Sequence, residues 1–565
     1  MGGVVRIGLA AILYCGVLAA APPLDPAEHL DYWLVQGVVP ATDALLQPLD
    51  LTLVQDDAIP IDGIEPIAAL AVYGRLTLVA PKGSARITLV DAQLREHLVG
   101  EFYLLLTEAS EIPLDGVCRE TCLLDAVTPH RLKITIKGAT LELDRLETRR
   151  QPEAPVGDLA GRQEQIRAVQ AEAIVARINA QITTLGLGWQ AGETAFSRMS
   201  FEDKKARCAS GRVPILHGFD YYVGGVFALP ESNEAGKGGG SGPVSRFDWR
   251  EKHLANDPGS PYYDGDPTGG GWMTPVTEQA CSDCWVHASV GMLEAIINLS
   301  LNRHRDVDLS EQDLLSCSGG GDCDGGQISD ALNYIVADEL VSELCFPYQG
   351  QPTPCIQHCA EPMIIAHLAG VTEVPLDLGE EAIKLALIQH GPLTFGIQDW
   401  WHYVVLVGFD RDPLDNQTIW IIKNSYGEDW GESGFGRLKL PMDEIYSVYG
   451  VSGARLIEQG QAASSACRDA DGDGYAAWGL NVQRPTGCQS TNGQQDCNDA
   501  DASEGPALVS GACLDISAPP PAPPPPAPPA PAPTSGGGGG GSAGLVLMAM
   551  LGSLALVEHR HVVHD

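Results

Sequence analysis

Fifteen cysteines are spread along this chain of 565 residues, and they constrain its fold more than any other feature of the sequence. A cytosolic enzyme rarely keeps so many thiols unless they bind metal, whereas an exported protein uses them in disulfides. The chain also has 35 basic and 73 acidic residues, a formal charge of −38. Nucleic-acid binding needs clustered lysine and arginine, so we expect no nucleic-acid partner. The length suggests several domains.

The two ends of the chain are typical of targeting segments. An apolar stretch follows Arg6 and ends in small residues, which predicts a signal peptide over residues 1–21. Residues 517–542 form a spacer rich in proline and glycine, and residues 543–565 form a short apolar segment with a tail. This order resembles C-terminal sorting signals of Gram-negative bacteria, and a plain membrane anchor is the alternative. Both predict an exported protein, at the cell surface or outer membrane or outside the cell, with the tail contacting the cell envelope.

The region between the signal peptide and the cysteine-rich part has two patterns. Residues 22–155 alternate apolar and polar side chains in short runs, at 76–79, 86–90 and 132–136 among others, which predicts a β-rich domain of unknown role. Residues 156–242 change to helical spacing and end in a glycine-rich linker. The apolar positions of that helix are Ile166, Val169, Ala173, Ile174, Ile178 and Ile182.

The segment around Cys284 carries the strongest chemical signal. Gln279 and Cys281 precede Cys284, and an apolar helical stretch follows it. A thiol at a helix N-terminus is favoured as the thiolate, the reactive nucleophile. A redox pair or half of a zinc site, formed with Cys281, is the alternative. The neighbouring Asp283 would raise the pKa of the thiol unless its side chain points to solvent.

Further motifs follow in order along the chain. They are 309–317, the glycines Gly325 and Gly326, 345–348, the stretch beginning Trp401-His402, and the stretch from Asn424 to Trp430. Together with the Cys284 segment, these motifs resemble the papain-like cysteine peptidases, or cathepsin family, over about 245 to 459. The stretch 345–359 looks most like the cathepsin C branch. Residues 156–242 resemble the inhibitory prosegment of that family, through Gly192, Thr194 and Phe196.

The resemblance implies an α+β fold with two lobes over residues 243–459. A helical lobe would carry Cys284, and a β-barrel-like lobe would carry His402 and Asn424. Cys284 would be the nucleophile, His402 the general base, and Asn424 the side chain that orients the imidazole. Gln279 would stabilise the oxyanion together with the backbone N–H of Cys284.

The resemblance also assigns residues around the substrate. Trp430 would shield the bond between Asn424 and His402 from water. Gly325 and Gly326 would form the wall that pairs with substrate backbone, because residues without side chains permit close approach. The expected partner is a peptide or protein substrate, the expected state is a monomer, and no cofactor is expected for catalysis.

Several positions depart from the family pattern. Only residues 399–401 separate a plausible strand end from His402, where the family has a longer loop. One residue is missing between Gln279 and Cys281, Tyr426 stands where the family has Trp, and His287 replaces a Phe. We expect His287 to be a core-edge histidine. The substrate preference and the choice between endo- and exopeptidase action are therefore not inherited. The competing interpretation is a catalytically silent papain fold that binds peptides or adheres at the cell surface.

The cysteines can be divided among these regions. The resemblance pairs Cys281 with Cys323 and Cys317 with Cys355, and it leaves Cys345 for Cys359. Cys118 and Cys122 are close enough in sequence to close a small loop. Cys15 falls in the signal peptide, Cys208 is an odd thiol in the prosegment-like region, and Cys284 stays free. Two bridges in the tail would join Cys467, Cys488, Cys497 and Cys513, by one of three connectivities.

Residues 466–516 form an acidic module. Asp469, Asp471 and Asp473 alternate with small residues and resemble the start of a calcium loop. Asp496 and Asp499 form a second acidic group. The pattern departs from an EF-hand because Leu480 stands where the twelfth-position Glu would be. The sequence predicts a Ca²⁺ site here, and a disulfide-held acidic spacer is the alternative.

Overall fold

A computed structural model describes residues 44–517, apart from 62–64, 80–81, 105–109, 151–157, 209–210, 226–242, 266–269, 306, 414 and 481. These residues fall within the unit Met1–Ser517. The expected signal peptide at 1–21, the glycine-rich linker at 236–242 and the tail from 518 onward, with its spacer and apolar segment, lie outside the described residues.

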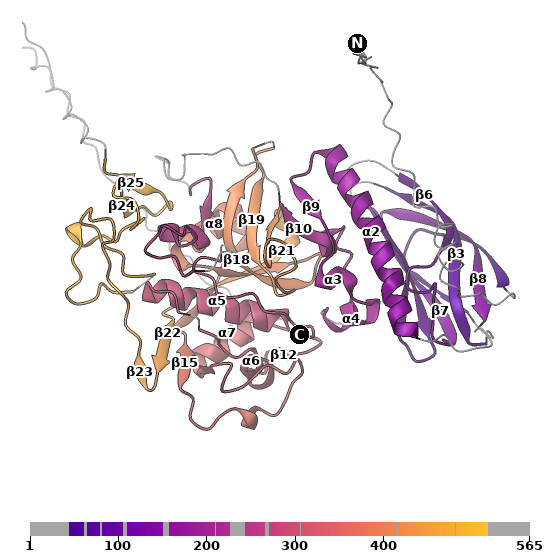
Figure 1. Ribbon diagram of the computed structural model, residues 1–565, viewed down its shortest axis with the longest axis horizontal. Coiled ribbons are helices and arrows are strands. Elements are labelled where there is room, and N and C mark those ends of the chain that lie inside the picture. Colours follow the sequence, from indigo (N-terminus) through magenta and orange to yellow (C-terminus); the bar gives the residue numbers. More distant parts are fainter. Residues whose placement is uncertain are drawn as a thin grey trace, which may run out of the picture. The chain divides into compact units, whose positions relative to one another are not determined.

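The N-terminal part consists of two four-stranded antiparallel sheets (Figure 1), ordered β1-β8-β3-β6 and β2-β7-β4-β5. Apolar residues that alternate along the strands, such as Leu70, Leu89 and Leu141, meet in one buried core. The strands are β1 (Ala44–Leu53), β2 (Asp57–Pro60), β3 (Ile67–Leu78), β4 (Ser84–Asp91), β5 (Glu96–Tyr103), β6 (Ser110–Val117), β7 (Pro129–Lys137) and β8 (Ala139–Arg150). Alternate residues of β7 and β8 are buried, as the alternation in the sequence predicts. The run 86–90 differs, because β4 is buried at every position. Cys118 and Cys122 are bonded in the loop after β6.

The prosegment-like region begins with the long helix α2 (Leu159–Leu185). Ile174, Ile178 and Ile182 are buried on one face, as the helical spacing predicts. The inclusion of Val169 in that face is wrong, because its side chain is 43% exposed. Its place is taken by the neighbouring Gln170, whose amide donates to a backbone carbonyl in the loop after β6.

Short elements follow α2 and lead towards the cysteine-rich part. They are β9 (Trp189–Ala191), α3 (Ala195–Arg198), α4 (Phe201–Ala206), η2 (Phe219–Tyr221) and β10 (Tyr222–Gly225), which pairs with β9. Thr194 and Ser197 form a reciprocal capping box that starts α3. Ser200 caps α4 through the backbone N–H of Asp203. These caps explain how two such short helices are set in place.

The helical lobe is built around α5 (Cys284–Leu301), with α6 (Glu311–Cys317) and α7 (Ile328–Ala337) packed against it. Every residue of α5 is buried. Among the described residues, α5 is the one helix long and apolar enough to span a membrane, but its complete burial marks it as a core helix. A short hairpin of β12 (Gly321–Asp322) and β13 (Gly325–Gly326) lies between α6 and α7 in the chain.

The strand-rich lobe is a seven-stranded sheet ordered β16-β21-β17-β18-β19-β20, with β11 (Phe247–Asp248) paired to β18. Its other strands are β16 (Gly370–Glu373), β17 (Leu393–Ile397), β18 (His402–Arg411), β19 (Thr418–Lys423), β20 (Phe435–Leu438) and β21 (Ile445–Ser452). The helix α8 (Glu380–His390) contacts β21 and β18. The helix α5 packs on β17 and β18, so the two lobes share one core.

A second small sheet orders β14 (Leu340–Val341), β15 (Ile364–His367), β22 (Arg455–Glu458) and β23 (Gln461–Ala462). Short 3₁₀ turns occur at η3 (Trp249–Leu254), η4 (Cys355–Gln357), η5 (Leu376–Leu378), η6 (Met442–Glu444) and η7 (Thr491–Gly493). These elements complete the part of the chain that positions the site.

The acidic module carries one hairpin, β24 (Glu504–Ala507) with β25 (Cys513–Asp515), and two disulfides, Cys467–Cys488 and Cys497–Cys513. Its backbone is joined to the end of α5. The N–H groups of Ala466 and Leu480 donate to the carbonyls of Leu301 and Leu299, at 2.8 and 2.9 Å. The side chain of Asn302 donates to the Ala477 carbonyl at 3.1 Å. The module therefore supplies partners for the carbonyls that end the helix.

Candidate active site

Cys284 is the first residue of α5, as the sequence pattern predicts, and it is 4% exposed. Burial raises the pKa of its thiol to about 12 and outweighs the backbone N–H of Tyr403, which favours the thiolate. The backbone N–H groups of Cys284 and Trp285 at the helix start favour the thiolate, as expected, but burial outweighs them in this state of the chain. Removing water costs the charged form more than the helix end returns.

His402 and Asn424 lie on neighbouring strands. His402 is the first residue of β18, and Asn424 directly follows β19, which pairs with β18 in antiparallel register. The His402 Nε2 atom lies 2.7 Å from the Asn424 Oδ1 atom. This bond fixes the ring and leaves Nδ1 as the nitrogen available to a thiol. The short 399–401 turn is thus sufficient to place the histidine at the strand end.

Burial favours the uncharged form of the histidine, as it does for the thiol. Burial lowers the pKa of His402 to about 4, although the hydrogen bond that its Nε2–H donates to Asn424 Oδ1 raises it. At neutral pH, the imidazole and the thiol are therefore both uncharged in the structure. The ion pair that the resemblance implies requires that water reach the site.

Aromatic side chains enclose the histidine. Tyr426 stacks on the His402 ring with centroids 4.7 Å apart, and it also stacks on Phe196 of α3 at 4.5 Å. Trp430 is fully buried and stands edge-on to Tyr426 at 6.1 Å. Its indole N–H donates to the carbonyl of Phe219. Trp430 thus lies where it can exclude water from the pair, and residues of the prosegment-like region take part in the same enclosure.

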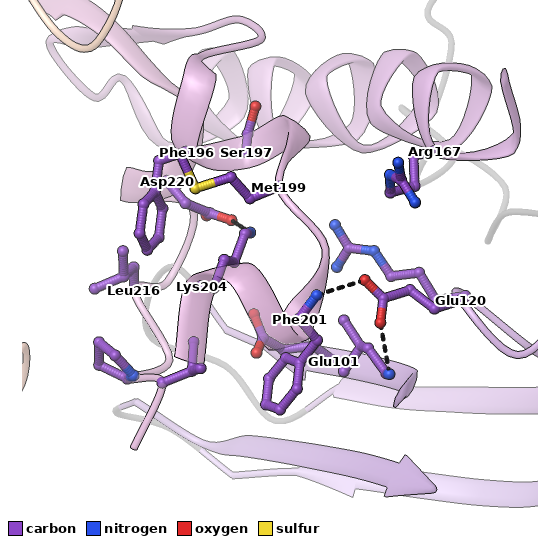
Figure 2. A pocket seen from close by; sticks show the side chains of 14 residues that line it. Glu101, Glu120, Arg167, Phe196, Ser197, Met199, Phe201, Lys204, Leu216 and Asp220 are labelled. Carbon is purple, nitrogen blue, oxygen red and sulfur yellow. Dashed lines mark hydrogen bonds and ion pairs between the residues drawn. The ribbon is translucent and has the colours of Figure 1, made fainter. Parts of the chain in front are cut away.

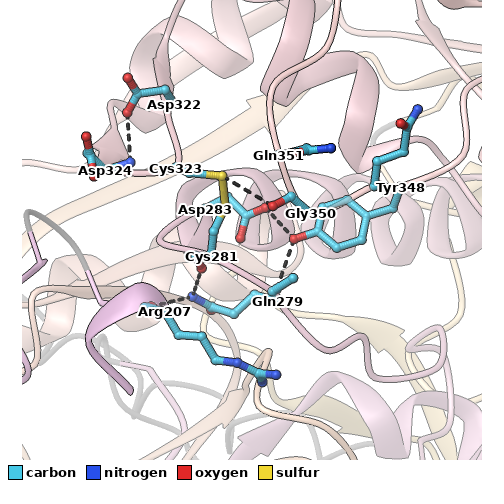
Figure 3. Close-up of a disulfide and its surroundings, with 12 residues drawn as sticks. Arg207, Gln279, Cys281, Asp283, Asp322, Cys323, Asp324, Tyr348, Gly350 and Gln351 are labelled. Atoms are coloured by element: carbon cyan, nitrogen blue, oxygen red, sulfur yellow. Dashed lines mark hydrogen bonds between the residues drawn. A yellow bond between two sulfur atoms is a disulfide. The ribbon is translucent and has the colours of Figure 1, made fainter. Parts of the chain in front are cut away.

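Gln279 is fully buried, and each end of its amide has a partner. The Nε2 group donates to the carbonyls of Arg207 and Cys281, at 3.0 and 2.8 Å, while Oε1 accepts from the Ser425 hydroxyl at 2.7 Å. Figure 3 shows Arg207 and Cys281 on either side of this nitrogen. The donor that the resemblance assigns to a substrate oxyanion is thus taken by the backbone carbonyls of Arg207 and Cys281.

The glycine wall next to the nucleophile has a steric reason. Gly325 and Gly326 form β13, and Gly325 has a φ of +125°. A Cβ atom on Gly326 would overlap the indole ring of Trp285. The Cys281–Cys323 disulfide ties this hairpin to the segment before Cys284 (Figure 3). Glycine is therefore required here for close packing as well as for access.

Asp283 does not point to solvent, so that alternative is wrong. Its side chain is fully buried and accepts a 2.5 Å hydrogen bond from the Tyr348 hydroxyl. Burial raises the pKa of Asp283, and its charge is one cause of the raised pKa of Cys284.

His287 is buried in a charged network rather than placed at the edge of the core. Its Nε2 atom lies 3.7 Å from Asp283, and its Nδ1 atom lies 3.5 Å from Glu311. Burial lowers the pKa of His287, but Glu311 and Asp283 together raise it above its ordinary value. The Nδ1 atom also lies 2.8 Å from the Thr277 hydroxyl. No spacing rule in the sequence connects Glu311 or Tyr348 with these two residues, which is why sequence reasoning missed the network.

The structure contains the three disulfides that the resemblance implies, Cys281–Cys323, Cys317–Cys355 and Cys345–Cys359. Among the described residues, the free cysteines are Cys208 and Cys284, and both are buried. The approach of Cys208 and Arg207 to the site was not predicted. In the sequence, the only sign of this approach is that the two residues stand at the end of the prosegment-like pattern.

The acidic module brings Asp471, Asp473 and Asp496 together. One carboxylate oxygen from each lies within 4.8 Å of the others. In each residue, Oδ1 accepts a local backbone N–H, whereas Oδ2 is buried without a hydrogen-bond partner in the described chain. Asp496 has no exposed surface. Desolvation first, and the neighbouring carboxylates next, raise its pKa to about 7.

Asp469, Asp471 and Asp499 form a second group. Both oxygens of Asp499 already accept hydrogen bonds, from the Ala470 N–H and from the Tyr262 hydroxyl. Of the five predicted ligands, the set with unpartnered oxygens is therefore Asp471, Asp473 and Asp496.

Solved structures of a procathepsin and of the bromelain protease are similar to this chain. Procathepsin L 3 of the Tenebrio molitor larval midgut is 21% identical, with a TM-score of 0.38, over 53% of this chain and 95% of that one. Bromelain of Ananas comosus in complex with the E64 inhibitor is 21% identical, with a TM-score of 0.30, over 37% of this chain and 98% of that one.

Curated relatives match the same part of the chain. Cysteine proteinase 15A of Pisum sativum is 29% identical over 229 residues, which is 34% of this chain and 56% of that protein. A cathepsin L-like protein of Caenorhabditis elegans is 30% identical over 218 residues, 34% of this chain and 58% of that protein. The chain thus spans little more than half the length of the curated relatives it matches.

The family described as papain family cysteine protease matches residues 264–401 and 396–449. The two matches overlap at 396–401, directly before His402, where the loop is short. They contain Cys284, His402 and Asn424. The segment from 264 to 449 is therefore homologous to the papain family of cysteine proteases.

Proposed function

We propose that this chain is a cysteine-type peptidase made as a zymogen. The observation that carries the proposal is the bond between His402 Nε2 and Asn424 Oδ1. His402 begins β18, the strand that packs against the helix starting at Cys284. This bond presents the other ring nitrogen for proton transfer, which is the arrangement that thiol catalysis needs. The homology of residues 264–449 supports the same activity.

Each of these groups has a role in the proposed reaction. His402 takes the proton of the Cys284 thiol, and the sulfur attacks the carbonyl carbon of a peptide bond. Gln279 and the Cys284 backbone N–H donate to the oxygen as it becomes negative. The imidazolium then protonates the leaving amine, and water hydrolyses the thioester in a second step. Asn424 holds the ring for both proton transfers.

The latent state follows from the position of residues 196–207. Phe196 stacks on Tyr426 over the histidine, and the Arg207 carbonyl takes the Gln279 donor. A substrate carbonyl needs the same donor. We therefore propose that the region 156–242 inhibits the peptidase until it is displaced or cleaved.

The disulfides support the export of this protein from the cytoplasm. The described residues contain six disulfides, which persist in oxidising environments. We propose an exported protein that reaches the cell surface or the outside of the cell, with the tail beyond residue 517 as its attachment to the envelope. Fusing residues 518–565 to a reporter and fractionating the cells tests the attachment. Release of the fusion into the medium without any envelope-bound form would contradict it.

The activity is tested with the purified chain after limited proteolysis of the prosegment-like region. We expect hydrolysis of a mixed peptide library under mild reducing conditions, and we expect Cys284→Ser and His402→Ala to remove it. Ser289→Ala, on the same helix but outside the site, is the matched control. A folded, cleaved protein that binds peptides without hydrolysing them would favour the silent binding protein instead.

The choice between endopeptidase and exopeptidase action is not inherited from the family, so it has to be measured. Peptides that differ only by N-terminal acetylation test this point. Equal cleavage of both forms at internal bonds would assign endopeptidase action, and loss of cleavage on acetylation would support the dipeptidyl peptidase branch.

A second function, Ca²⁺ binding by the acidic module, is favoured by the unpartnered oxygens. We propose that Asp471, Asp473 and Asp496 hold one Ca²⁺ ion. Buried carboxylate oxygens without hydrogen-bond donors repel one another, and a hard divalent cation is the ligand that satisfies them. The module is joined to the end of α5, so the ion would also stabilise the peptidase core.

Calcium binding is measured by calorimetric titration and by the melting temperature of the calcium-free chain. We expect Ca²⁺ to raise the melting temperature, and we expect Asp496→Asn to remove that rise. Asp501→Asn is the matched control, because Asp501 lies in the same module and its side chain accepts from Ser503 outside the three-carboxylate group. A rise that persists in Asp471→Asn and Asp496→Asn would contradict this site.

A further inference from the structure

Two thiols that make no disulfide lie in the same buried core. Among the described residues, Cys208 and Cys284 are the free cysteines, and they are 7% and 4% exposed. Both belong to the hydrophobic cluster that also contains Tyr426. Cys284 has a role in the proposed reaction. Cys208 has none, although it is a nucleophilic side chain brought from the prosegment-like region into the same core.

The backbone next to Cys208 is anchored to the segment that leads into Cys284. The Arg207 carbonyl accepts from Gln279 Nε2 at 3.0 Å, and the same nitrogen donates to the Cys281 carbonyl at 2.8 Å (Figure 3). The Arg207 guanidinium donates to Glu278 at 2.8 Å. Residue 207 is therefore held by its carbonyl and by its side chain against residues 278–281, and Cys208 is its direct neighbour.

The electrostatics of the two thiols agree with this placement. Burial raises the pKa of Cys208 to about 12, and the charge of Cys284 raises it further in the same direction. Burial raises the pKa of the Tyr426 phenol, and the charges of Cys208 and Cys284 raise it further.

We propose that Cys208 and Cys284 are a modification site at which a disulfide joins the prosegment-like region to the proposed nucleophile. The inference rests on the proposed function for its consequence, a covalently blocked peptidase, but the bond itself is detected without any activity. The partner in the reaction is a small-molecule or protein disulfide, the chemical class that also supplies the six disulfides of the described chain.

The reaction is two thiol–disulfide exchanges. The thiolate of Cys208 attacks one sulfur of the disulfide, forms a mixed disulfide and releases one thiolate. The thiolate of Cys284 then attacks the Cys208 sulfur and releases the second thiolate. Two protein thiols lose two protons and two electrons, and the external disulfide accepts them as two thiols. The exchange belongs to the period of folding before the core closes, because both thiols are largely protonated once they are buried.

The consequence is a nucleophile with its sulfur already bonded. Non-covalent inhibition depends on the hydrogen bond to Gln279 and on packing, and both are lost whenever the region 195–208 lifts away. A disulfide would keep the region in place through such openings. An external thiol would reverse both exchanges and return Cys284 to its reactive form.

The test is a disulfide map of the full-length chain. The protein is folded with oxidised and reduced glutathione, alkylated with iodoacetamide and digested without reduction, and its peptides are identified by mass spectrometry. We expect a peptide pair that joins residues 208 and 284 and disappears on reduction. Alkylation of both thiols, or a separate glutathione adduct on each without the joined pair, would overturn the proposal.

Two variants keep the result independent of folding and of the proposed activity. In Cys208→Ser, which retains the other six bridges, we expect Cys284 to be alkylated at least tenfold more than in the wild type. Cys208→Ala gives the same expectation if serine at this buried position impairs folding. A joined pair in a chain that never cleaves peptides would support the disulfide and refute the peptidase. An active chain with both thiols free would do the reverse.

Discussion

At the residue scale, the reactivity of Cys284 depends on water as much as on its position at a helix start. The backbone N–H groups at the start of α5 favour a thiolate, but the thiol pKa is raised to about 12 because the site is buried. His402 is neutral for the same reason. Uncovering the site therefore changes the protonation of both groups.

This dependence predicts a pH profile. In the Cys208→Ser background, where Cys284 has no partner thiol, alkylation of the intact chain should rise about tenfold for each pH unit between 7 and 10, because the thiolate fraction rises in that way below the pKa. After removal of the prosegment-like region, the rate should level off within this range. A plateau below pH 8 in the intact chain would contradict the buried thiol.

The Asn424 side chain should matter for the rate more than for substrate binding. In Asn424→Ala, the His402 ring loses the bond that orients it, and we expect kcat of the cleaved enzyme to fall by about a hundredfold, the lower end of general acid–base contributions. KM should change by less than threefold. Steady-state kinetics measure both constants, and a change in KM alone would assign Asn424 to substrate binding instead.

The glycine wall gives a stability prediction. Gly326→Ala forces a methyl group into the Trp285 ring, and we expect it to lower the free energy of unfolding by about 1–3 kcal/mol, as overpacked cores do. Gly291→Ala is the control, since the nearest atom to its added methyl group is 3.5 Å away and the position is helical. Denaturant unfolding measures both. An equal effect of the two substitutions would contradict the packing argument.

At the element scale, the two N-terminal sheets formed by β1 to β8, which we call the sandwich, hold α4, the helix that precedes Cys208. Glu120 accepts from the backbone N–H of Phe201, at the start of α4, and from that of Leu98 in β5, at 2.7 and 2.9 Å. Figure 2 shows this carboxylate between the two elements, with the Lys204–Asp220 ion pair nearby. These sheets, for which the sequence suggested no role, thus contact α4, which belongs to the region that we propose to be inhibitory.

Removing this contact should make Cys284 accessible to alkylation more often. Glu120→Ala leaves two backbone N–H groups without their acceptor, and we expect α4 to lift more often, with a roughly tenfold faster alkylation of Cys284 in the Cys208→Ser background. Glu111→Ala is the control, because its ion pair with Arg75 is exposed on β6. Equal rates in the two variants would show that the sandwich does not hold α4.

Acid should open the same element. The pKa of His402 is about 4 in the closed chain, against an ordinary value of 6.5. As the pH falls from 6.5 to 4, the open chain binds a proton that the closed chain excludes, so closure becomes weaker by up to about 300-fold. Hydrogen exchange in α4, compared with His402→Asn at each pH, measures this effect. The same pH dependence in both proteins would contradict it.

At the scale of the whole molecule, the sequence predicted the parts that depend on local pattern. Alternation indicated the strands of the N-terminal part, and the ordered motifs around Cys284, His402 and Asn424 indicated their meeting between a helix and a sheet. Each of these residues stands at the start or end of a regular element, where a motif is easy to recognise.

What sequence could not predict are contacts made across regions. The Arg207 carbonyl on Gln279, the burial of Asp283 under Tyr348 and the approach of Cys208 join residues that are far apart in the chain. The exposure of Val169 has a similar origin, because the buried face of α2 is the one that packs on Ala191 and Tyr221, which follow the helix in the chain. Such contacts carry no periodic or spacing signal.

The central claim is that Cys284 is a nucleophile activated by His402 and covered by the region 156–242. Labelling with a thiol-directed epoxide inhibitor, located by mass spectrometry, tests it most directly. We predict stoichiometric labelling at Cys284 after reduction and removal of that region, little labelling of the intact chain, and loss of labelling in His402→Ala. A folded, cleaved protein that remains unlabelled, or equal labelling with and without His402, would contradict the account.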